Sequence, residues 1–303
     1  MKTNPSRDAI LSVGRIYCDL VFAGVPSMPQ MGREVFAQSM QPVLGGGAFI
    51  AAAHLVQLER PVALLASYGI DPLSLALEPQ LDASGIELTF VERSADAGPQ
   101  VTVVITAPND RAFLSRRAGK AVPGGFEAAL GWERAALLHI AEYATLAEQP
   151  DLVARAKAHG LLVSLDPSWD DTLISDPRLI SACAGVDVFL PNAEEALAIT
   201  GAATIDDALN SLAESFPLVV VKCGGKGAVL AAGTTRLSIP APKVNVVDPT
   251  GAGDAFNAGF LDAYLRERPL PECLAAGIAA GSRSVQSIGG APVSAHHFAD
   301  RTG

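Results

Sequence analysis

The amino-acid sequence predicts an α/β protein with a mainly parallel central sheet flanked by helices and a small β-sheet lid. From Leu137 onward, continuous apolar runs of strand length alternate with stretches of helix length, as in a parallel sheet covered on both faces. Two N-terminal segments instead alternate apolar and polar residues without a helical period, which is typical of a small exposed sheet. We therefore expect a single domain over residues 1–303, with lid segments at about 15–43 and 87–116 inserted in it.

The expected elements place polar side chains just beyond the ends of strands. Asp166, Asn192 and Lys222 each come within two residues of the end of an apolar run. Because ligands of open α/β sheets bind outside the carboxyl ends of the strands, we expect these side chains to meet at one edge of the sheet. In chain order, the expected elements are a strand at 9–13, lid strands within 34–43, a helix at 47–58, lid strands within 87–113, and strands at 161–165, 186–190, 218–221 and 244–247.

Composition restricts the classes of partner. Of the 303 residues, 49% are hydrophobic and 18% are charged, which suits a large folded core. The net charge of −10 argues against nucleic acid and against an anionic membrane surface, because both favour a basic face. The four cysteines are scattered without metal-ligand or redox spacing, and charged residues interrupt the N-terminal apolar runs. We expect a cytoplasmic protein whose partners are small molecules.

Residues 248–256 are the most informative segment, because Gly251 and Gly253 precede Asp254 at the expected start of a helix. The first backbone N–H groups of a helix have no intrahelical partner, and with the helix dipole they attract an anion. A carboxylate beside bound phosphate is unfavourable unless it has a role, such as accepting a proton from an attacking hydroxyl. The pattern indicates a phosphoryl-transfer site. In the structural alternative, Thr250 caps the helix and Asp254 complements its dipole.

Other nucleotide-binding classes lack their motifs in this sequence. There is no G-x-x-x-x-G-K-[ST], which excludes a P-loop, and neither the H-R-D nor the D-F-G of protein kinases occurs. The glycine runs at 45–47 and 251–253 do not complete a dinucleotide fingerprint, since Ile50 and Phe256 occupy the third glycine position. A nucleotide-dependent oxidoreductase and a non-catalytic sugar- or nucleotide-binding protein remain as alternatives.

Residues 248–259 resemble the C-terminal signature of the ribokinase-like, or phosphofructokinase B, carbohydrate kinases. The pair Gly45-Gly46 before an alanine-rich helix resembles their N-terminal signature, and the resemblance runs from about Ile10 to Pro292. It implies a ribokinase-like fold, ATP with Mg²⁺ as phosphoryl donor, and a hydroxyl of a sugar, sugar phosphate or nucleoside as acceptor. It also implies that Asp254 is the catalytic base and that the backbone N–H groups of Gly251, Ala252 and Gly253 form an anion hole.

Further positions match the family residue by residue. For the acceptor, Asp19 matches an acid that binds hydroxyls, and Gly45 and Gly46 match a turn that lets backbone approach the sugar. Ile50 departs from the pattern, because the family usually has Asn there. The strand-end motif Asp166-Pro167-Ser168-Trp169-Asp170 departs as well, since an Asn and an Arg are common in it. These departures favour a nucleoside or an atypical sugar over ribose or fructose.

The same resemblance assigns residues to metal ions. Asn192 and Glu195 match the family's Asn-x-x-Glu, which orders Mg²⁺ and phosphate; the spacing also fits a helix capping box, and both roles can coexist. Asp248 and the Thr250 carbonyl match a monovalent-cation site, for K⁺, found in part of the family, although Pro249 stands where Thr is frequent.

On the nucleotide side, Lys222, Gly225 and Gly227 match the loop that contacts ATP, although a lysine that ends a strand is otherwise usually solvated. Ile278 replaces a common Asn in the adenine-side helix, which favours base recognition by backbone and apolar packing. Because a small lid sheet would expose its edges and its apolar face, we also expect a homodimer that pairs through the lid.

Overall fold

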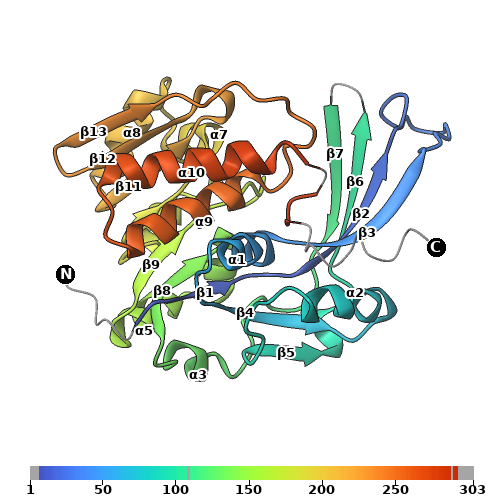
Figure 1. The fold of residues 1–303 in the computed structure, drawn as a ribbon, viewed down its shortest axis with the longest axis horizontal. Coiled ribbons are helices and arrows are strands. Elements are labelled where there is room, and N and C mark those ends of the chain that lie inside the picture. Colours follow the sequence, from blue (N-terminus) through green and yellow to red (C-terminus); the bar gives the residue numbers. More distant parts are fainter. Residues whose placement is uncertain (1–6, 108–109, 288, 293–303) are drawn as a thin grey trace.

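The computed structural model describes residues 7–107, 110–287 and 289–292, and a nine-stranded sheet forms the centre of this part of the chain (Figure 1). Its strand order is β13-β12-β11-β10-β9-β8-β1-β4-β5. The strands from β11 to β5 pair in parallel, and β12 and β13 are added antiparallel at one edge. The strands are β1 Ala9–Val13, β4 Val62–Gly69, β5 Val91–Ser94, β8 Ala135–Ile140, β9 Leu162–Leu165, β10 Val188–Phe189, β11 Leu218–Lys222, β12 Ala228–Ala232 and β13 Thr235–Ile239. The expected parallel α/β sheet is confirmed.

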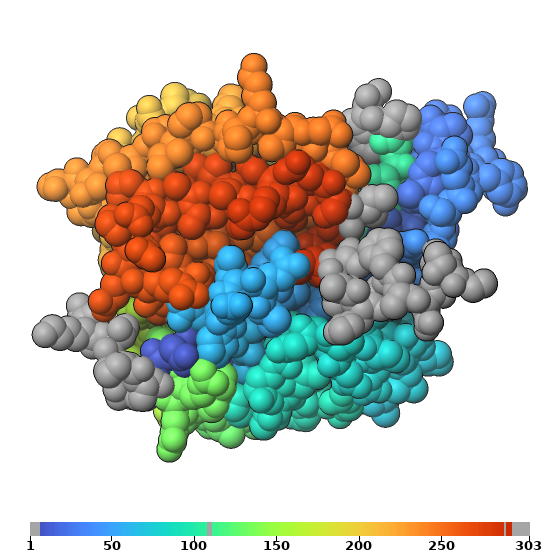
Figure 2. Space-filling view, in the orientation of Figure 1, coloured from blue at the N-terminus to red at the C-terminus, as the bar shows by residue number. Residues whose placement is uncertain are grey.

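Both faces of the sheet are buried, as the unbroken apolar strands predicted. Ile10 packs into one core cluster and the next residue, Leu11, packs into a second cluster on the opposite face. The first face is covered by α1 Gly47–Gln57, α2 Pro72–Asp82, α9 Ala252–Leu265 and α10 Leu270–Ser284, and Figure 2 shows α10, α9 and α1 packed in succession there. The second face is covered by α3 Phe126–Leu130, α4 Tyr143–Glu148, α5 Leu152–Ala158, α6 Leu179–Ala182, α7 Ala193–Thr200 and α8 Ile205–Ala213.

A separate four-stranded sheet, in the order β3-β2-β6-β7, stands beside one end of the large sheet (Figure 1). It consists of β2 Tyr17–Ala23, β3 Ser39–Gly45, β6 Val101–Ala107 and β7 Asp110–Arg116. Pairing is antiparallel within β2–β3 and β6–β7, and parallel between β2 and β6. Two distant stretches of chain therefore combine into one lid, as expected.

Two sequence-based expectations about strands are wrong. Residues 87–94 do not belong to the lid: β5 pairs in parallel with β4 at the edge of the large sheet, because it returns directly from α2 as a β-α-β unit. Residues 244–247 are not a strand. That segment has no strand beside it, and its Val247 N–H donates instead to the Val285 carbonyl at the end of α10. Val246 and Val247 are half exposed, so apolar composition alone misled the prediction.

Among the described residues, no helix combines the length and the apolar character that a bilayer span requires.

All four cysteines are free thiols. Burial raises the pKa of Cys18, Cys183 and Cys273 well above the usual range, to about 11, 12 and 11. These three thiols therefore stay protonated and unreactive at neutral pH.

Candidate active site

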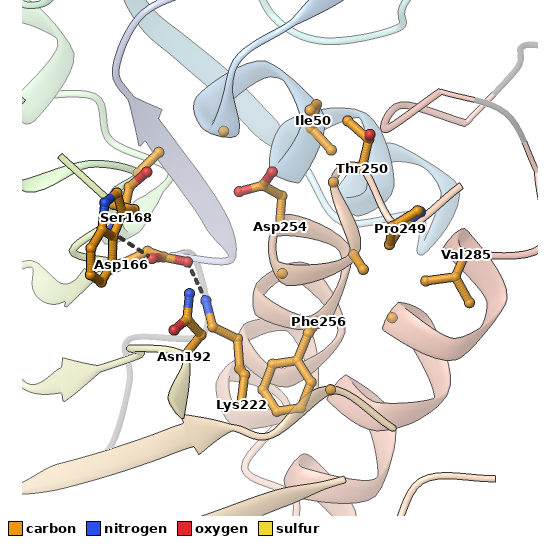
Figure 3. A pocket seen from close by; sticks show the side chains of 18 of the residues that line it. Ile50, Asp166, Ser168, Asn192, Lys222, Pro249, Thr250, Asp254, Phe256 and Val285 are labelled. Carbon is orange, nitrogen blue, oxygen red and sulfur yellow. Dashed lines mark hydrogen bonds and ion pairs between the residues drawn. The ribbon is translucent and has the colours of Figure 1, made fainter. Parts of the chain in front are cut away.

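A cavity of about 1180 Å³ opens at the carboxyl ends of the parallel strands, between the large sheet and the lid. The polar side chains that follow strands β9, β10 and β11, namely Asp166, Asn192 and Lys222, all line it, as Figure 3 shows. Asp254 at the start of α9 faces them across the cavity (Figure 3). The expectation that these motifs meet at one edge of the sheet is confirmed.

The α9 helix begins at the glycine motif. Gly251 is its N-terminal capping residue and has a left-handed backbone, with φ of 70°, and no side chain caps the helix. A Cβ on Gly251 would lie 2.5 Å from Cα of Gly290, so this position accepts only glycine. Thr250 is thus not the cap, which contradicts that part of the structural alternative, whereas Asp254 does lie in the first turn where it complements the helix dipole. Ala252 and Gly253 supply N–H groups to the first turn, and Ala252 makes only a long 3.4 Å bond back to the Pro249 carbonyl.

Asp254 lies in the first turn of α9 and inside the cavity. Burial raises the pKa of its carboxyl to about 7; repulsion from Asp166 and Asp19 adds to the shift and attraction to Lys222 opposes it. A carboxyl with a pKa near neutrality can exchange a proton at working pH, which an ordinary aspartate cannot do as readily. Gly47, at the start of α1, borders this carboxyl: a Cβ there would lie 2.9 Å from Asp254 Oδ1.

Lys222 is buried at the centre of the site and is not a solvated surface charge. Its ammonium group forms an ion pair with Asp166 and donates to Asn257 Oδ1 at 3.3 Å. Burial alone would lower the pKa of Lys222, but attraction to Asp166 and Glu195 outweighs burial and raises it. Lys222 therefore carries a fixed positive charge. Sequence reasoning missed Asn257, for which only its place one turn after the glycine motif was a signal.

Asn192 and Glu195 form the capping box of α7. Asn192 Oδ1 accepts from the Glu195 N–H at 2.9 Å, and Glu195 Oε2 accepts from the Asn192 N–H at 2.7 Å. Both residues also line the cavity. Burial raises the pKa of Glu195 to about 7, and repulsion from Asp166 adds to this effect. The capping role is confirmed, and the carboxylate also lies where it can act on a ligand.

Asp19 and the glycines of the lid hinge lie together at the opposite end of the cavity. A Cβ on Gly45 would lie 1.9 Å from Asp19 Oδ2, so glycine at 45 makes room for this carboxyl. Gly46 has φ of 92° and packs on the Arg15 carbonyl. Burial raises the pKa of Asp19 to about 7, and a hydrogen bond from Thr102 partly offsets this. Asp19 and Gly46 line the cavity as expected.

The sequence suggested that Arg15, Arg111, Arg116 and Arg117 could reach the carboxylate of an acid sugar, and Arg15, Arg111 and Arg117 do line the cavity, but their ion pairs and the aromatic side chains around Asp19 were not predicted. Arg15 is fully buried and pairs with Glu142 at 3.1 Å and with Glu148. Arg117, directly after β7, pairs with Asp170 at 2.9 Å. The aromatic residues here are Tyr17, Phe113 and Trp169, all of which line the cavity. Ile50 lies farther along, beside Thr250 (Figure 3).

The expected nucleotide-side residues border the cavity near α10. Residues Gly224–Lys226 form a 3₁₀ turn after β11, and Gly227 follows with φ of 95°. A Cβ on Gly227 would lie 2.0 Å from the Ile239 carbonyl, so only glycine fits. Gly225 and Ile278 also line the cavity, which gives this end backbone groups and an apolar surface.

Asp248 holds two loops together. Its Oδ1 accepts from the Thr250 N–H at 2.9 Å and its Oδ2 accepts from the Gly289 N–H at 3.0 Å. His54 Nε2 contacts the Gly290 carbonyl at 2.9 Å from the other side. The loop that carries Gly251 is therefore fixed to residues 289–290. Each carboxylate oxygen of Asp248 accepts a hydrogen bond from a backbone N–H. Only the remaining lone pairs of these oxygens are available to a cation.

Lid and body touch at the end of the cavity where the glycine motif lies. Arg111 of β7 donates to Thr250 Oγ1 at 3.3 Å, and its guanidinium lies over the Phe113 ring at 5.1 Å. The lid thus contacts the loop that leads into the glycine motif.

Comparison with known proteins agrees with this geometry. Residues 9–296 match the pfkB family of carbohydrate kinases. An ATP-dependent ribose-1-phosphate kinase from Halopiger xanaduensis is 30% identical over 88% of this chain and 88% of that protein. A nucleoside kinase from Methanothermobacter thermautotrophicus is 27% identical over 87% of this chain and 85% of that protein. The structure of Arabidopsis thaliana ribokinase, complexed with ribose and ATP, covers 94% of this chain and 95% of its own with a TM-score of 0.81 at 23% identity.

The family match covers nearly the whole chain, and its range of residues spans the glycine motif, the strand ends and the lid. The protein therefore belongs to the pfkB family of ATP-dependent sugar and nucleoside kinases, with a ribokinase-like fold.

Proposed function

We propose that the protein transfers the γ-phosphoryl group of ATP to a hydroxyl of a nucleoside, with Asp254 as the general base. The observation that carries this proposal is Asp254 itself: a carboxyl with a pKa of about 7 in the first turn of a helix that begins at two glycines. The acceptor hydroxyl gives its proton to Asp254 and its oxygen attacks the γ-phosphorus. The bond from phosphorus to the β,γ-bridging oxygen of ATP breaks, and ADP leaves.

The glycine motif stabilises the charge that spreads over the transferred phosphoryl group. The N–H groups of Gly251, Ala252 and Gly253 lie at the start of α9, where no carbonyl of the helix pairs with them, and the positive end of the helix dipole lies there too. Donors that are already in place are most effective where charge develops during the reaction. Lys222 adds a positive charge beside the first turn of α9.

The residues around Glu195 fit Mg²⁺ that is held through water. Repulsion from the Asp166 carboxylate raises the pKa of both Glu195 and Asp254, so a divalent cation among these side chains relieves repulsion. Within the described residues, no three acidic, histidine or cysteine side chains are arranged as a direct metal cage. Mg²⁺ commonly keeps several waters and binds phosphate oxygens with few protein ligands. Asn192 and Glu195 would hold it, and bound Mg²⁺ would supply charge neutralisation of the phosphates.

The nucleotide occupies the end of the cavity near α10. Gly225 and Gly227 give the phosphates close access to backbone, and Ile278 packs against the base. We also propose that K⁺ binds at the loop of Asp248 and the Thr250 carbonyl, where its charge stabilises the conformation of the glycine motif.

The charge of the acceptor end favours a neutral acceptor. The two relatives named above act on ribose 1-phosphate and on nucleosides, which differ in charge. Here Arg15 and Arg117 are already paired with Glu142, Glu148 and Asp170, and Asp19 and Asp171 add further acids. An anionic group at this end would face an excess of carboxylates, whereas Tyr17, Phe113 and Trp169 offer aromatic surface to a base.

An acceptor screen that couples ADP release to a spectroscopic signal tests the proposal. Purine and pyrimidine nucleosides should be turned over at least ~10-fold more efficiently in kcat/KM than ribose, fructose, ribose 1-phosphate or acid sugars. If none of these compounds causes ADP release, the result would favour the non-catalytic binding protein. Efficient turnover of ribose 1-phosphate with nucleosides inert would show that the acceptor-end ion pairs open to receive a phosphate.

A cytoplasmic homodimer completes the proposal. The lid exposes Phe36, Met40 and Leu114, at 74%, 51% and 72% of their surface, which a second copy of the chain would cover.

A further inference from the structure

Three buried polar side chains from three different elements meet behind the glycine motif. Asp166 follows β9, Lys222 ends β11 and Asn257 lies on α9, 91 residues along the chain from Asp166. Asn257 has no solvent exposure and Asp166 has 6%. Asn257 Nδ2 donates to Asp166 Oδ2 at 2.6 Å, and Lys222 Nζ donates to the same carboxylate oxygen and to Asn257 Oδ1 at 3.3 Å. Each of the three side chains therefore contacts the other two.

This arrangement fixes where the Lys222 ammonium lies. Its Nζ is 3.5 Å from the place that a Cβ on Gly253 would take, so it stands next to the first turn of α9. An ammonium has three N–H donors. Asp166 and Asn257 accept from it, and no third acceptor is found for Lys222 among the residues that the structure describes. One donor thus remains for a ligand bound at the glycine motif.

We propose that Asn257 is a positioning residue, which orients Asp166 and thereby holds the Lys222 ammonium against the phosphoryl group that is transferred. This inference rests on the proposed function. The chemistry explains the amide: Asn257 donates to Asp166 and accepts from Lys222, which requires both kinds of atom in one side chain. Aspartate could accept only and would add a charge, and an apolar residue would do neither. Without Asn257, Lys222 keeps its ion pair but loses the second contact that selects one position of a flexible side chain.

A purely structural role for Asn257 would be to satisfy two buried polar neighbours. That role predicts a loss of stability with no specific effect on the γ-phosphate. A double-mutant cycle separates the two explanations, because residues that act through one another give non-additive effects. Asn257→Ala, Lys222→Met and the double variant form the cycle. Asp262→Ala is the control for a destabilised α9. Asp262 lies on the same helix as Asn257 but away from the cavity, and its replacement breaks a buried 2.7 Å ion pair with Arg60.

The decisive measurement is binding of AMP-PNP and of ADP, each with Mg²⁺, by calorimetry, because only AMP-PNP carries a γ-phosphate. Lys222→Met should weaken AMP-PNP at least ~10-fold more than ADP. Asn257→Ala should weaken AMP-PNP selectively by a smaller factor, and the double variant should equal Lys222→Met. Parallel kinetics should show kcat lowered in the same order, with the KM of the acceptor little changed. Asp262→Ala should lower the melting temperature and leave both affinities and kcat at wild-type values.

Three results would overturn the inference: equal weakening of AMP-PNP and ADP in Lys222→Met, wild-type binding in Asn257→Ala, or losses that multiply in the double variant. If Asn257→Ala does not fold, Asn257→Ser takes its place, and the comparison of Lys222→Met with wild type still tests the γ-phosphate contact. Wild-type protein that binds neither nucleotide would instead refute the proposed function, and the inference with it.

Discussion

A Cβ atom at position 47 would fall 2.9 Å from Oδ1 of Asp254, although the two residues begin helices that are more than 200 positions apart in the sequence. Gly47 starts α1 and Asp254 lies in the first turn of α9, and these two helices pack against each other. The glycine run 45–47 therefore serves two sites. Gly45 makes room for Asp19, and Gly47 makes room for Asp254.

Gly47→Ala should lower kcat at least ~10-fold, because real Cβ atoms essentially never approach another atom at 2.9 Å and the Asp254 carboxylate has to move. A displaced general base is out of line with the acceptor hydroxyl. Gly125→Ala is the matched control, since its φ is −86° and nothing lies within 4 Å of an added Cβ. Equal kcat in the two variants would mean that the carboxylate relaxes without cost.

Asp254→Asn should lower kcat by ~10²–10⁴-fold with a modest change in KM, because the amide cannot accept the proton of the acceptor hydroxyl. Circular dichroism and ADP binding establish that the variant is folded and still binds nucleotide. Turnover close to wild type would show that another group, or water, is the base.

Activity should depend on pH through Asp254. Burial, followed by repulsion from Asp166 and Asp19, raises its pKa to about 7, and only the deprotonated form accepts a proton. We expect kcat/KM to be constant above about pH 7 and to fall as the pH drops below it, approaching ~10-fold per unit. Asp19 and Glu195 also have raised pKa values near 7 and will steepen the fall. A profile that stays flat down to pH 5.5 is incompatible with this assignment.

Glu195→Gln should leave the melting temperature unchanged and raise the Mg²⁺ concentration needed for half-maximal activity. Glutamine still accepts the 2.7 Å hydrogen bond from the Asn192 N–H, so the capping box survives, but it has no charge to organise Mg²⁺ and its waters. Thermal melts and Mg²⁺ titrations measure the two effects separately. A lower melting temperature with an unchanged Mg²⁺ requirement would leave capping as the whole role of Glu195.

Leu114→Glu should convert a dimer to a monomer at micromolar concentration. Leu114 is 72% exposed on β7, and a charge there opposes burial of the lid against a second copy. Light scattering gives the mass, and Leu75→Glu, at an exposed apolar position on α2, is the control. A wild-type protein that is monomeric and fully active would rule out the lid dimer.

The parts of the site that could be predicted from the sequence are those formed by residues close together along the chain. The glycine motif before Asp254, the capping box and the polar ends of strands are local patterns, and parallel topology alone brings the strand ends together. The contacts of Asn257 could not be predicted, because its partners lie 91 and 35 residues away and their meeting depends on how α9 packs on the sheet. The ion pairs of Arg15 and Arg117 are tertiary for the same reason.

The errors about strands have a physical explanation as well. The alternation in residues 87–94 describes a strand with one exposed side, and this holds equally for a lid strand and for β5 at the edge of the large sheet. Val246 and Val247 have strand-like side chains but no neighbouring strand with which to pair.

Asp19 belongs to lid strand β2, whereas Asp254 belongs to α9 of the body. In the proposed reaction, the lid carboxyl binds the acceptor and the body carboxyl deprotonates it, so the reaction needs one group from each part with an acceptor between them. The lid would then act as a safeguard against wasteful hydrolysis: without an acceptor, ATP meets an incomplete site and water is a poorly placed nucleophile.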